Sequence, residues 1–266
     1  MQLEASRGPI EQLDVHAVAV SVFKDEKPDD GFLKKLDELS GGFVKSAIES
    51  EEFTGKEGET AYLHLLGNKK FKAQRLLLVG VGETSEYEAA QVSQMAGTAF
   101  RYLRSKNAKS IAIVPRAGID PDSAATAALA GSFVGLFDPE KYRTVEKEEK
   151  QVDRLIVVVE GGDEDSLKQA VERGRIIGES VNFTRDLANE PGAYMTPSNM
   201  AERAREIANE FGLSIDVLDE ARMEQEGMGS LLSVSRGSDE PAKLIILKYV
   251  PANFDEETKE LLAFVG

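Results

Sequence analysis

The sequence feature that most constrains the fold is a set of short runs that are apolar at almost every position. Residues 15–23 (VHAVAVSVF), 110–114 (SIAIV) and 155–159 (LIVVV) are of this kind. A strand with one face in water alternates polar and apolar residues. Runs that are apolar at both odd and even positions therefore predict strands buried on both faces. Helical patterns separate these runs, and this alternation predicts a largely parallel sheet with helices on both faces.

The rest of the first 160 residues fits the same α/β plan. Apolar residues at helical spacing predict helices over residues 31–39, 42–48, 87–105 and 121–137. Two more strands are expected at residues 60–66 and 75–81, joined by a hairpin turn at 67–70. Small residues at Ala124, Ala128 and Gly131 favour close packing of the last helix. Residues 138–150 are rich in charge and predict a solvated loop, so we expect the first domain to span residues 1–160.

The segment LLLVGVGE, residues 76–83, resembles a strand that leads into a phosphate-binding turn. Gly80 and Gly82 would let the backbone approach a phosphate at the start of the next helix. The third glycine of the dinucleotide motif is missing, and Glu83 and Glu86 would repel an anion. A tight strand-to-helix turn whose acidic residues favour the helix dipole is the simpler interpretation.

Composition excludes several classes of function. The chain has 266 residues, of which 41% are hydrophobic and 30% charged, as is ordinary for a globular protein of two domains. Its apolar runs are too short to span a bilayer, and its first ten residues lack the apolar core of a secretory signal. We therefore expect a cytoplasmic location and no membrane partner. The net charge of −15 disfavours nucleic acid, whose phosphates it would repel.

The chain has no cysteine, which removes disulfides, thiolate nucleophiles and Cys-ligated zinc sites. Its two histidines, His16 and His64, lie in strand-like runs. A Ser-His-Asp triad would have to recruit one of them, and a strand histidine with a local hydrogen bond is the simpler interpretation. Any catalytic metal would depend on carboxylates and neutral oxygens, which suit Mn²⁺ or Mg²⁺ and tolerate Zn²⁺.

Residues 161–189 are predicted to form a connecting helix. Apolar and small residues recur at three- and four-residue spacing from Leu167 to Ala188. A helix over residues 164–188 would be on the order of 35 Å long. Pro191 and Gly192 end it. The junction NFTRDLANEPGAYMTP, residues 182–197, is thus expected to be a hinge.

A second α/β region is expected over residues 190–266. Thr196 is a candidate N-cap for a helix over residues 197–211, because Pro197 suits the first helical position. We expect strands at residues 213–218, 231–235 and 243–250, a short helix at 219–226 and a loop at 251–259. The last six residues, LLAFVG at 261–266, have the pattern of a buried strand.

Three blocks of this region resemble the leucyl aminopeptidases, the cytosolic peptidases with a dinuclear metal centre. They are TRDLANEPGAYMTPSNMA at 184–201, VLDEARMEQEGMGSLLSVSRGSDEPAKLIILKY at 217–249, and LLAFVG at 261–266. The first domain matches more loosely, mainly through residues 76–83 and Tyr142-Arg143. The resemblance implies an N-terminal domain similar to macro domains, a connecting helix, and the beginning of a catalytic domain.

The resemblance also implies an activity. Members of this family remove N-terminal residues, leucine among them, from peptides with a water activated by two divalent ions, Mn²⁺ or Zn²⁺. They are cytoplasmic homo-hexamers. The family's metal-binding lysine, its Asp-Gly-Gly motif and its NTDAEGR motif follow a Val-Gly pair like Val265-Gly266, and none is in this sequence. We therefore assign no catalytic or metal-binding residue, and expect the first half of a longer enzyme that alone binds no catalytic metal and is inactive.

Two other functions stay open from the sequence. A macro-like domain could serve as a nucleotide or ADP-ribose-binding module, which tight binding of ADP-ribose in calorimetry would favour. A non-catalytic chain could instead act as an assembly subunit, which light scattering of the chain mixed with a complete enzyme would test.

Overall fold

The computed structural model describes residues 1–138, 142, 144, 145, 150–252, 254 and 261–266. These form two compact units, Met1–Asp186 and Leu187–Gly266, which are treated separately below. The described residues leave out parts of the predicted loops at 138–150 and 251–259. They also leave out Arg143 of the Tyr142-Arg143 pair. Within the described part of the chain, no helix is both long and apolar enough to cross a membrane.

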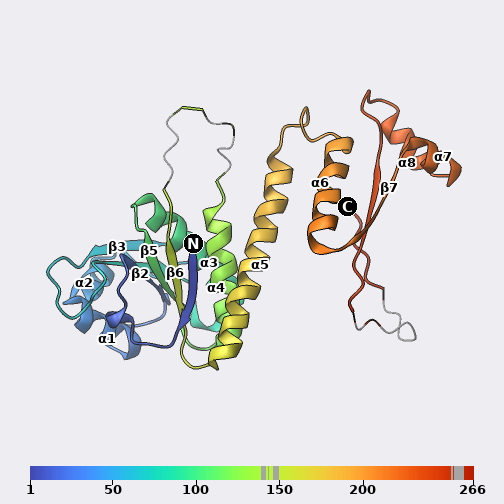
Figure 1. Ribbon diagram of the computed structural model, residues 1–266. Helices are drawn as coiled ribbons and strands as arrows, with labels where there is room; N and C mark the ends of the chain where they lie inside the picture. Colours follow the sequence, from blue (N-terminus) through green and yellow to red (C-terminus); the bar gives the residue numbers. More distant parts are fainter. Residues whose placement is uncertain (139–141, 143, 146–149, 253, 255–260) are drawn as a thin grey trace. The chain divides into compact units, whose positions relative to one another are not determined.

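The first unit contains a six-stranded mixed sheet, and five of its strands were predicted from the sequence (Figure 1). Its spatial order is β1-β6-β5-β2-β4-β3. The strands are β1 (Gln2–Ser6), β2 (Ala17–Val22), β3 (Thr60–His64), β4 (Arg75–Gly80), β5 (Ser110–Val114) and β6 (Arg154–Val158). All pairings are parallel except that of β3 with β4. The sheet therefore has one common carboxyl edge for five of its strands.

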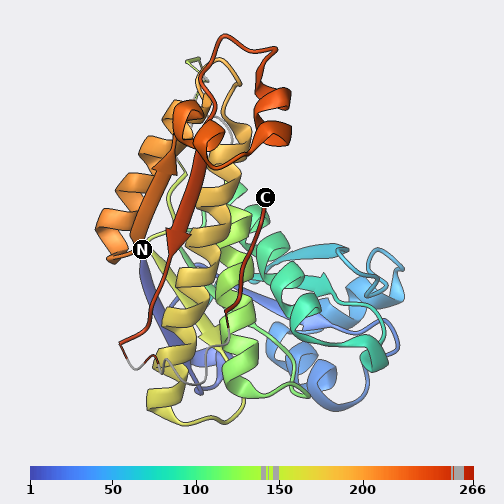
Figure 2. The same cartoon turned by 90° about the vertical axis from the view of Figure 1, so that its right-hand side faces the viewer.

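Two hydrophobic cores lie on opposite faces of this sheet. In β2, Ala17 and Ala19 belong to one core and Val18 and Val20 to the other. Helices α3 (Ala89–Ser105), α4 (Pro121–Leu136) and α5 (Glu164–Asn189) cover the first face, and α1 (Gly31–Ser40) and α2 (Phe43–Glu49) the second (Figures 1 and 2). This confirms the predicted sheet with helices on both faces.

The helices of the first face pack through small residues. Ala124 and Ala128 are buried, and a Cβ on Gly131 of α4 would lie 2.0 Å from the carbonyl oxygen of Ser93 in α3. A Cβ on Gly174 of α5 would likewise lie 2.6 Å from both the side chain of Leu129 and the backbone of Thr126. The first half of α5 is therefore part of the helical layer, beside α4 in both views, and does not stand free of the sheet (Figure 2).

The second unit contains five described elements. They are α6 (Pro197–Phe211), β7 (Ser214–Leu218), α7 (Glu220–Gln225), α8 (Gly229–Ser235) and β8 (Leu244–Lys248). Strands β7 and β8 pair antiparallel. The bounds predicted for α6 are confirmed, and its N-cap is Thr196, whose hydroxyl accepts a hydrogen bond from the backbone N–H of Asn199 at 3.3 Å.

Two predictions for this unit were wrong. Residues 231–235, expected to be a strand, lie in α8, because a short apolar run fits both periods and Gly229 starts a helical turn. Residues 261–266 are not a strand but irregular, and the side chains of Phe264 and Val265 are 90% and 97% exposed. An apolar run becomes a strand only where a neighbouring strand bonds to it, and no strand of the described sheets pairs with residues 261–266.

Three details of the first unit also differ from the predictions. The sequence did not predict strand β1, which lies at the edge of the sheet. Its only apolar residues are Leu3 and Ala5, and they alternate with polar ones. The four-residue turn at 67–70 is a longer connection over residues 65–74, because Phe71 and Ala73 are buried in the core. Helix α3 starts at Ala89 and not at Tyr87.

Candidate functional site

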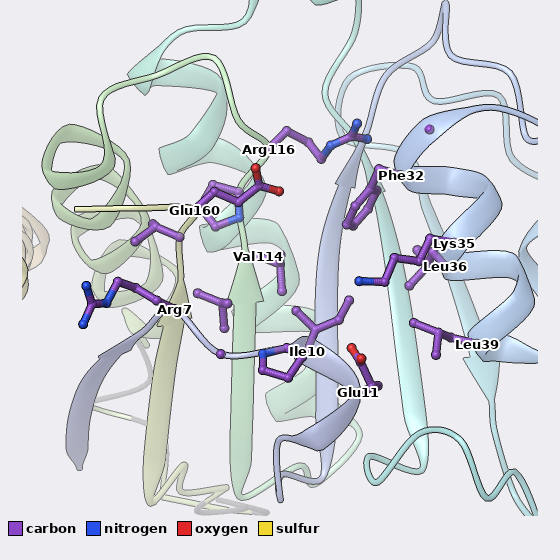
Figure 3. Close-up of a pocket in the computed structure, with 16 residues that line it drawn as sticks. Arg7, Ile10, Glu11, Phe32, Lys35, Leu36, Leu39, Val114, Arg116 and Glu160 are labelled. Carbon is purple, nitrogen blue, oxygen red and sulfur yellow. The ribbon is translucent and has the colours of Figure 1, made fainter. Parts of the chain in front are cut away.

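The carboxyl edge of the sheet carries the candidate site. From β2 the chain passes through α1 and α2 towards β4, whereas from β5 it passes through α4 to β6 on the other side. The strand order thus reverses between β2 and β5, the position at which open α/β sheets hold ligands in a crevice. A cavity of about 390 Å³ lies there, lined by residues that follow β1, β5 and β6 and by α1 (Figure 3).

The cavity follows from an incomplete helical layer. Among the described elements, α1 and α2 are the only α-helices of this face. The segment between β1 and β2, with its single 3-10 turn η1 (Ile10–Gln12), takes the place of a further helix. The apolar part of its lining is formed by Ile10, Phe32, Leu36, Leu39, Val114 and Val158. We call this cavity the edge crevice.

Arg116, directly after β5, is held in place from three sides. Its guanidinium donates hydrogen bonds of 2.6 and 2.8 Å to the two carboxylate oxygens of Glu26 and lies 4.2 Å above the ring of Phe32. Its backbone N–H donates to the hydroxyl of Tyr87 at 2.9 Å, and burial raises the pKa of that hydroxyl. Arg116 therefore shapes the crevice, and its charge is neutralised by Glu26.

Two other charged side chains face the space from opposite walls. Lys35 extends from α1 towards the segment that carries Ile10 and Glu11 (Figure 3). The Oε2 atom of Glu11 is buried and has no hydrogen-bond partner among the described residues. Lys35 and Glu11 form no ion pair with each other in the described structure. Arg7 and Glu160 complete the charged lining, and Arg7 donates to the carbonyl oxygen of Gly162.

The turn after β4 is not a phosphate site. The backbone N–H groups of Gly80 and Gly82 donate to the carbonyl oxygens of Glu59 and Gly55, at 2.8 and 3.1 Å. A Cβ on Gly80 would lie 2.0 Å from the carbonyl oxygen of Lys56. Backbone packing thus requires a glycine at position 80, and the amides of Gly80 and Gly82 already have hydrogen-bond acceptors. This supports the interpretation of a tight turn.

Of the two acidic residues named for that turn, Glu83 does not act as predicted. Glu83 pairs with Lys24 at 2.7 Å and does not cap α3. The N-cap of α3 is Glu88, which forms a reciprocal capping box with Gln91. The capping box explains why α3 starts two residues later than expected.

Among the residues that the structure describes, neither histidine forms part of a Ser-His-Asp triad. His16 precedes β2 at the amino edge of the sheet, opposite to the edge crevice, and its Nδ1 lies 2.6 Å from Oγ of Ser110. His64 ends β3, and its ring makes an edge contact with Tyr62 at 4.9 Å. In the described part of the chain, no carboxylate is bonded to either ring. His16 is therefore a histidine with a local hydrogen bond, as the sequence indicated.

The first part of the predicted hinge anchors α5. The side-chain amide of Asn182 donates to the carbonyl oxygen of Phe133 at 2.6 Å. The guanidinium of Arg185 donates to the carbonyl oxygen of Val134 at 3.1 Å and lies 4.2 Å above the ring of Phe137. Both carbonyl groups belong to the last turn of α4, where helical donors run out, and that of Val134 also accepts from the backbone N–H of Phe137 at 3.3 Å. Residues 182–185 therefore have a structural role that the sequence pattern did not reveal.

The described residues do not assemble a metal centre. No group of three or more His, Cys, Asp or Glu side chains within them is placed to hold an ion. We assign none of them as a metal ligand, and the sequence-based assignment of no catalytic residue stays a prediction.

Comparison with known proteins places the chain in a family. The N-terminal domain of the cytosol aminopeptidase family matches residues 19–146, and the catalytic domain of the same family matches residues 182–266. The chain belongs to the cytosol aminopeptidase family. This confirms the resemblance seen in residues 184–266.

Relatives support the same family assignment. A probable cytosol aminopeptidase of Solibacter usitatus is 40% identical over 252 residues, which cover 95% of this chain and 49% of the relative. One of Alkaliphilus metalliredigens is 31% identical over 272 residues, which cover 100% of this chain and 53% of the relative. The chain thus spans about half the length of the curated relatives it matches.

Solved structures of similar fold align with most of this chain and with about half of their own length. A mutant of tomato leucine aminopeptidase aligns with a TM-score of 0.79 and 23% identity, over 92% of this chain and 50% of that one. The bottromycin maturation enzyme BotP, in complex with Mn, aligns with a TM-score of 0.68 and 23% identity, over 90% of this chain and 46% of that one. This chain therefore shares the fold of the aligned parts of these two proteins.

Proposed function

We propose that this chain is the N-terminal portion of a metallo-aminopeptidase that removes unsubstituted N-terminal amino acids, leucine among them, from peptides. One observation carries the proposal. The N-terminal and the catalytic domain of the cytosol aminopeptidase family match the chain in that order, over residues 19–146 and 182–266. The substrates are peptides, and the role is peptide turnover in the cytoplasm by a homo-hexamer.

Two divalent ions, Mn²⁺ or Zn²⁺, would supply the chemistry, by lowering the pKa of a bound water and polarising the scissile carbonyl. The described residues do not fit such a centre, since no acidic or histidine cluster forms among them. No reaction step is therefore assigned to them. Their part in the proposed enzyme is to form the first unit, to anchor α5 and to begin the catalytic unit.

The experiment is a peptidase assay on the protein encoded by the complete open reading frame. We expect hydrolysis of leucine 4-nitroanilide with Mn²⁺ or Zn²⁺, and its loss after chelation. The N-acetylated substrate serves as the control, because an aminopeptidase needs a free amino terminus. Equal hydrolysis of the acetylated substrate, or full activity without metal, would refute the proposal.

A further inference from the structure

We propose that the edge crevice binds a small zwitterion, namely a free amino acid with an aliphatic side chain. The crevice lies where the strand order reverses, the usual place for a ligand in an open α/β sheet. Its volume of about 390 Å³ is near the lower end of the roughly 300–1,000 Å³ found for ligand pockets. A small ligand therefore fits better than a dinucleotide.

The charges of the crevice are arranged for a ligand with one charge of each sign. Lys35 and Glu11 lie on opposite walls and form no ion pair in the described structure. The Oε2 atom of Glu11 is buried without a hydrogen-bond partner among the described residues, which is costly for a carboxylate. If the ammonium group of the ligand donates a hydrogen bond to Glu11, it offsets this cost. The carboxylate of the same ligand would accept a hydrogen bond from Lys35.

The apolar lining selects the ligand side chain. Phe32, Leu36 and Leu39 of α1 face Ile10 and Val114 across the cavity. An aliphatic side chain would bury its surface against these residues.

A phosphate ligand is disfavoured by the same residues. Two acidic residues, Glu11 and Glu160, line the crevice, and the guanidinium of Arg116 is neutralised by Glu26. The amides of Gly80 and Gly82, which could have bound a phosphate at the end of β4, are bonded to the backbone. A nucleotide would therefore meet repulsion and few free donors.

The link to catalysis rests on the proposed function. An aminopeptidase releases free amino acids, so the ligand of the crevice would be a product of the enzyme. The edge crevice would then act as a product sensor.

The test is titration of the isotope-labelled 266-residue chain with L-leucine, followed by amide chemical shifts in NMR. We expect shifts concentrated at residues 7–11, 31–39 and 114–116. Lys35→Met and Glu11→Gln should each weaken binding about tenfold, as expected for loss of a hydrogen bond to a charged group. Two probes that lack one charge, 4-methylpentanoate and isoamylamine, should bind weakly or not at all.

Matched variants control for general effects of charge. Lys34→Met and Glu38→Gln change neighbouring residues of α1 that do not line the crevice, and should alter affinity by less than about twofold. Equal weakening by these variants, absence of leucine-dependent shifts, or tighter binding of AMP than of leucine would overturn the proposal. The titration measures binding and not turnover, so it tests the crevice independently of the proposed function. If leucine binds but the complete protein has no peptidase activity, the proposed binding site stands and only the proposed function is refuted.

Discussion

Gly80 and Gly131 illustrate, at the scale of single residues, why a glycine pattern can mislead. A Cβ at either position would lie 2.0 Å from a backbone carbonyl oxygen, that of Lys56 or of Ser93. Backbone atoms cannot move aside as the end of a flexible side chain can. In the sequence, Gly80 looks like part of a ligand-binding loop, and only the packing of residues 55–56 reveals its role.

This packing predicts that Gly131→Ala destabilises the first unit. The alanine gains about 1 kcal/mol of helix propensity. Overpacking against fixed atoms typically costs about 1–3 kcal/mol, and a contact of 2.0 Å is severe. We expect a net loss of about 1–2 kcal/mol in urea unfolding followed by circular dichroism. Gly229→Ala, at a helical glycine with no neighbour within 4 Å, is the control and should cause no loss.

The pair of Glu4 with Arg154 gives a pH-dependent prediction. Arg154 donates two hydrogen bonds to the Glu4 carboxylate, at 3.0 and 2.7 Å, and these hold its pKa below the ordinary value. Since the carboxyl pKa is lower in the folded chain, the stabilisation is present above the pKa of the unfolded chain. It is lost as the pH falls through the folded-state value.

Arg154→Met should therefore raise the pKa of Glu4 in NMR titration. It should lower stability at neutral pH, and its difference from the natural chain should shrink as the pH falls through the lowered pKa of Glu4. A difference in stability that stays constant down to strongly acidic pH would contradict this assignment.

At the scale of elements, the sequence predicted most of the first unit, because strands buried on both faces leave a clear pattern. The sequence-based prediction was wrong where the structure of a segment depends on its contacts with other segments. Strand β1 forms because it can pair with the edge of β6. Residues 231–235 are helical, although their apolar run fits the period of a strand as well as that of a helix. The edge crevice was also missed, since Glu11, Lys35 and Arg116 are far apart in the sequence and ordinary in their local patterns.

The anchoring of α5 predicts a local effect of Asn182→Ala. Without the hydrogen bond to Phe133, the C-terminal half of α5 should open more often, because a typical hydrogen bond contributes about 1 kcal/mol. Hydrogen exchange should become severalfold faster at residues 178–186 and stay unchanged at residues 164–174. Thr184→Ala removes only a bond within α5 and should leave the exchange of residues 178–186 close to that of the natural chain. Uniform acceleration along α5 would contradict the anchoring role.

At the scale of the whole molecule, the chain combines a unit with a six-stranded sheet and a unit whose described residues form a two-stranded sheet. Both match domains of one enzyme family, and the chain spans about half the length of its curated relatives. The described residues form no metal cluster, so we propose that catalysis requires residues outside them.

The most direct test of this account compares two proteins in one assay. The 266-residue chain and the product of the complete open reading frame are given leucine 4-nitroanilide and Mn²⁺ at equal molar concentration. We predict turnover by the complete product and none by the 266-residue chain. Measurable, metal-dependent turnover by the 266-residue chain would contradict the account.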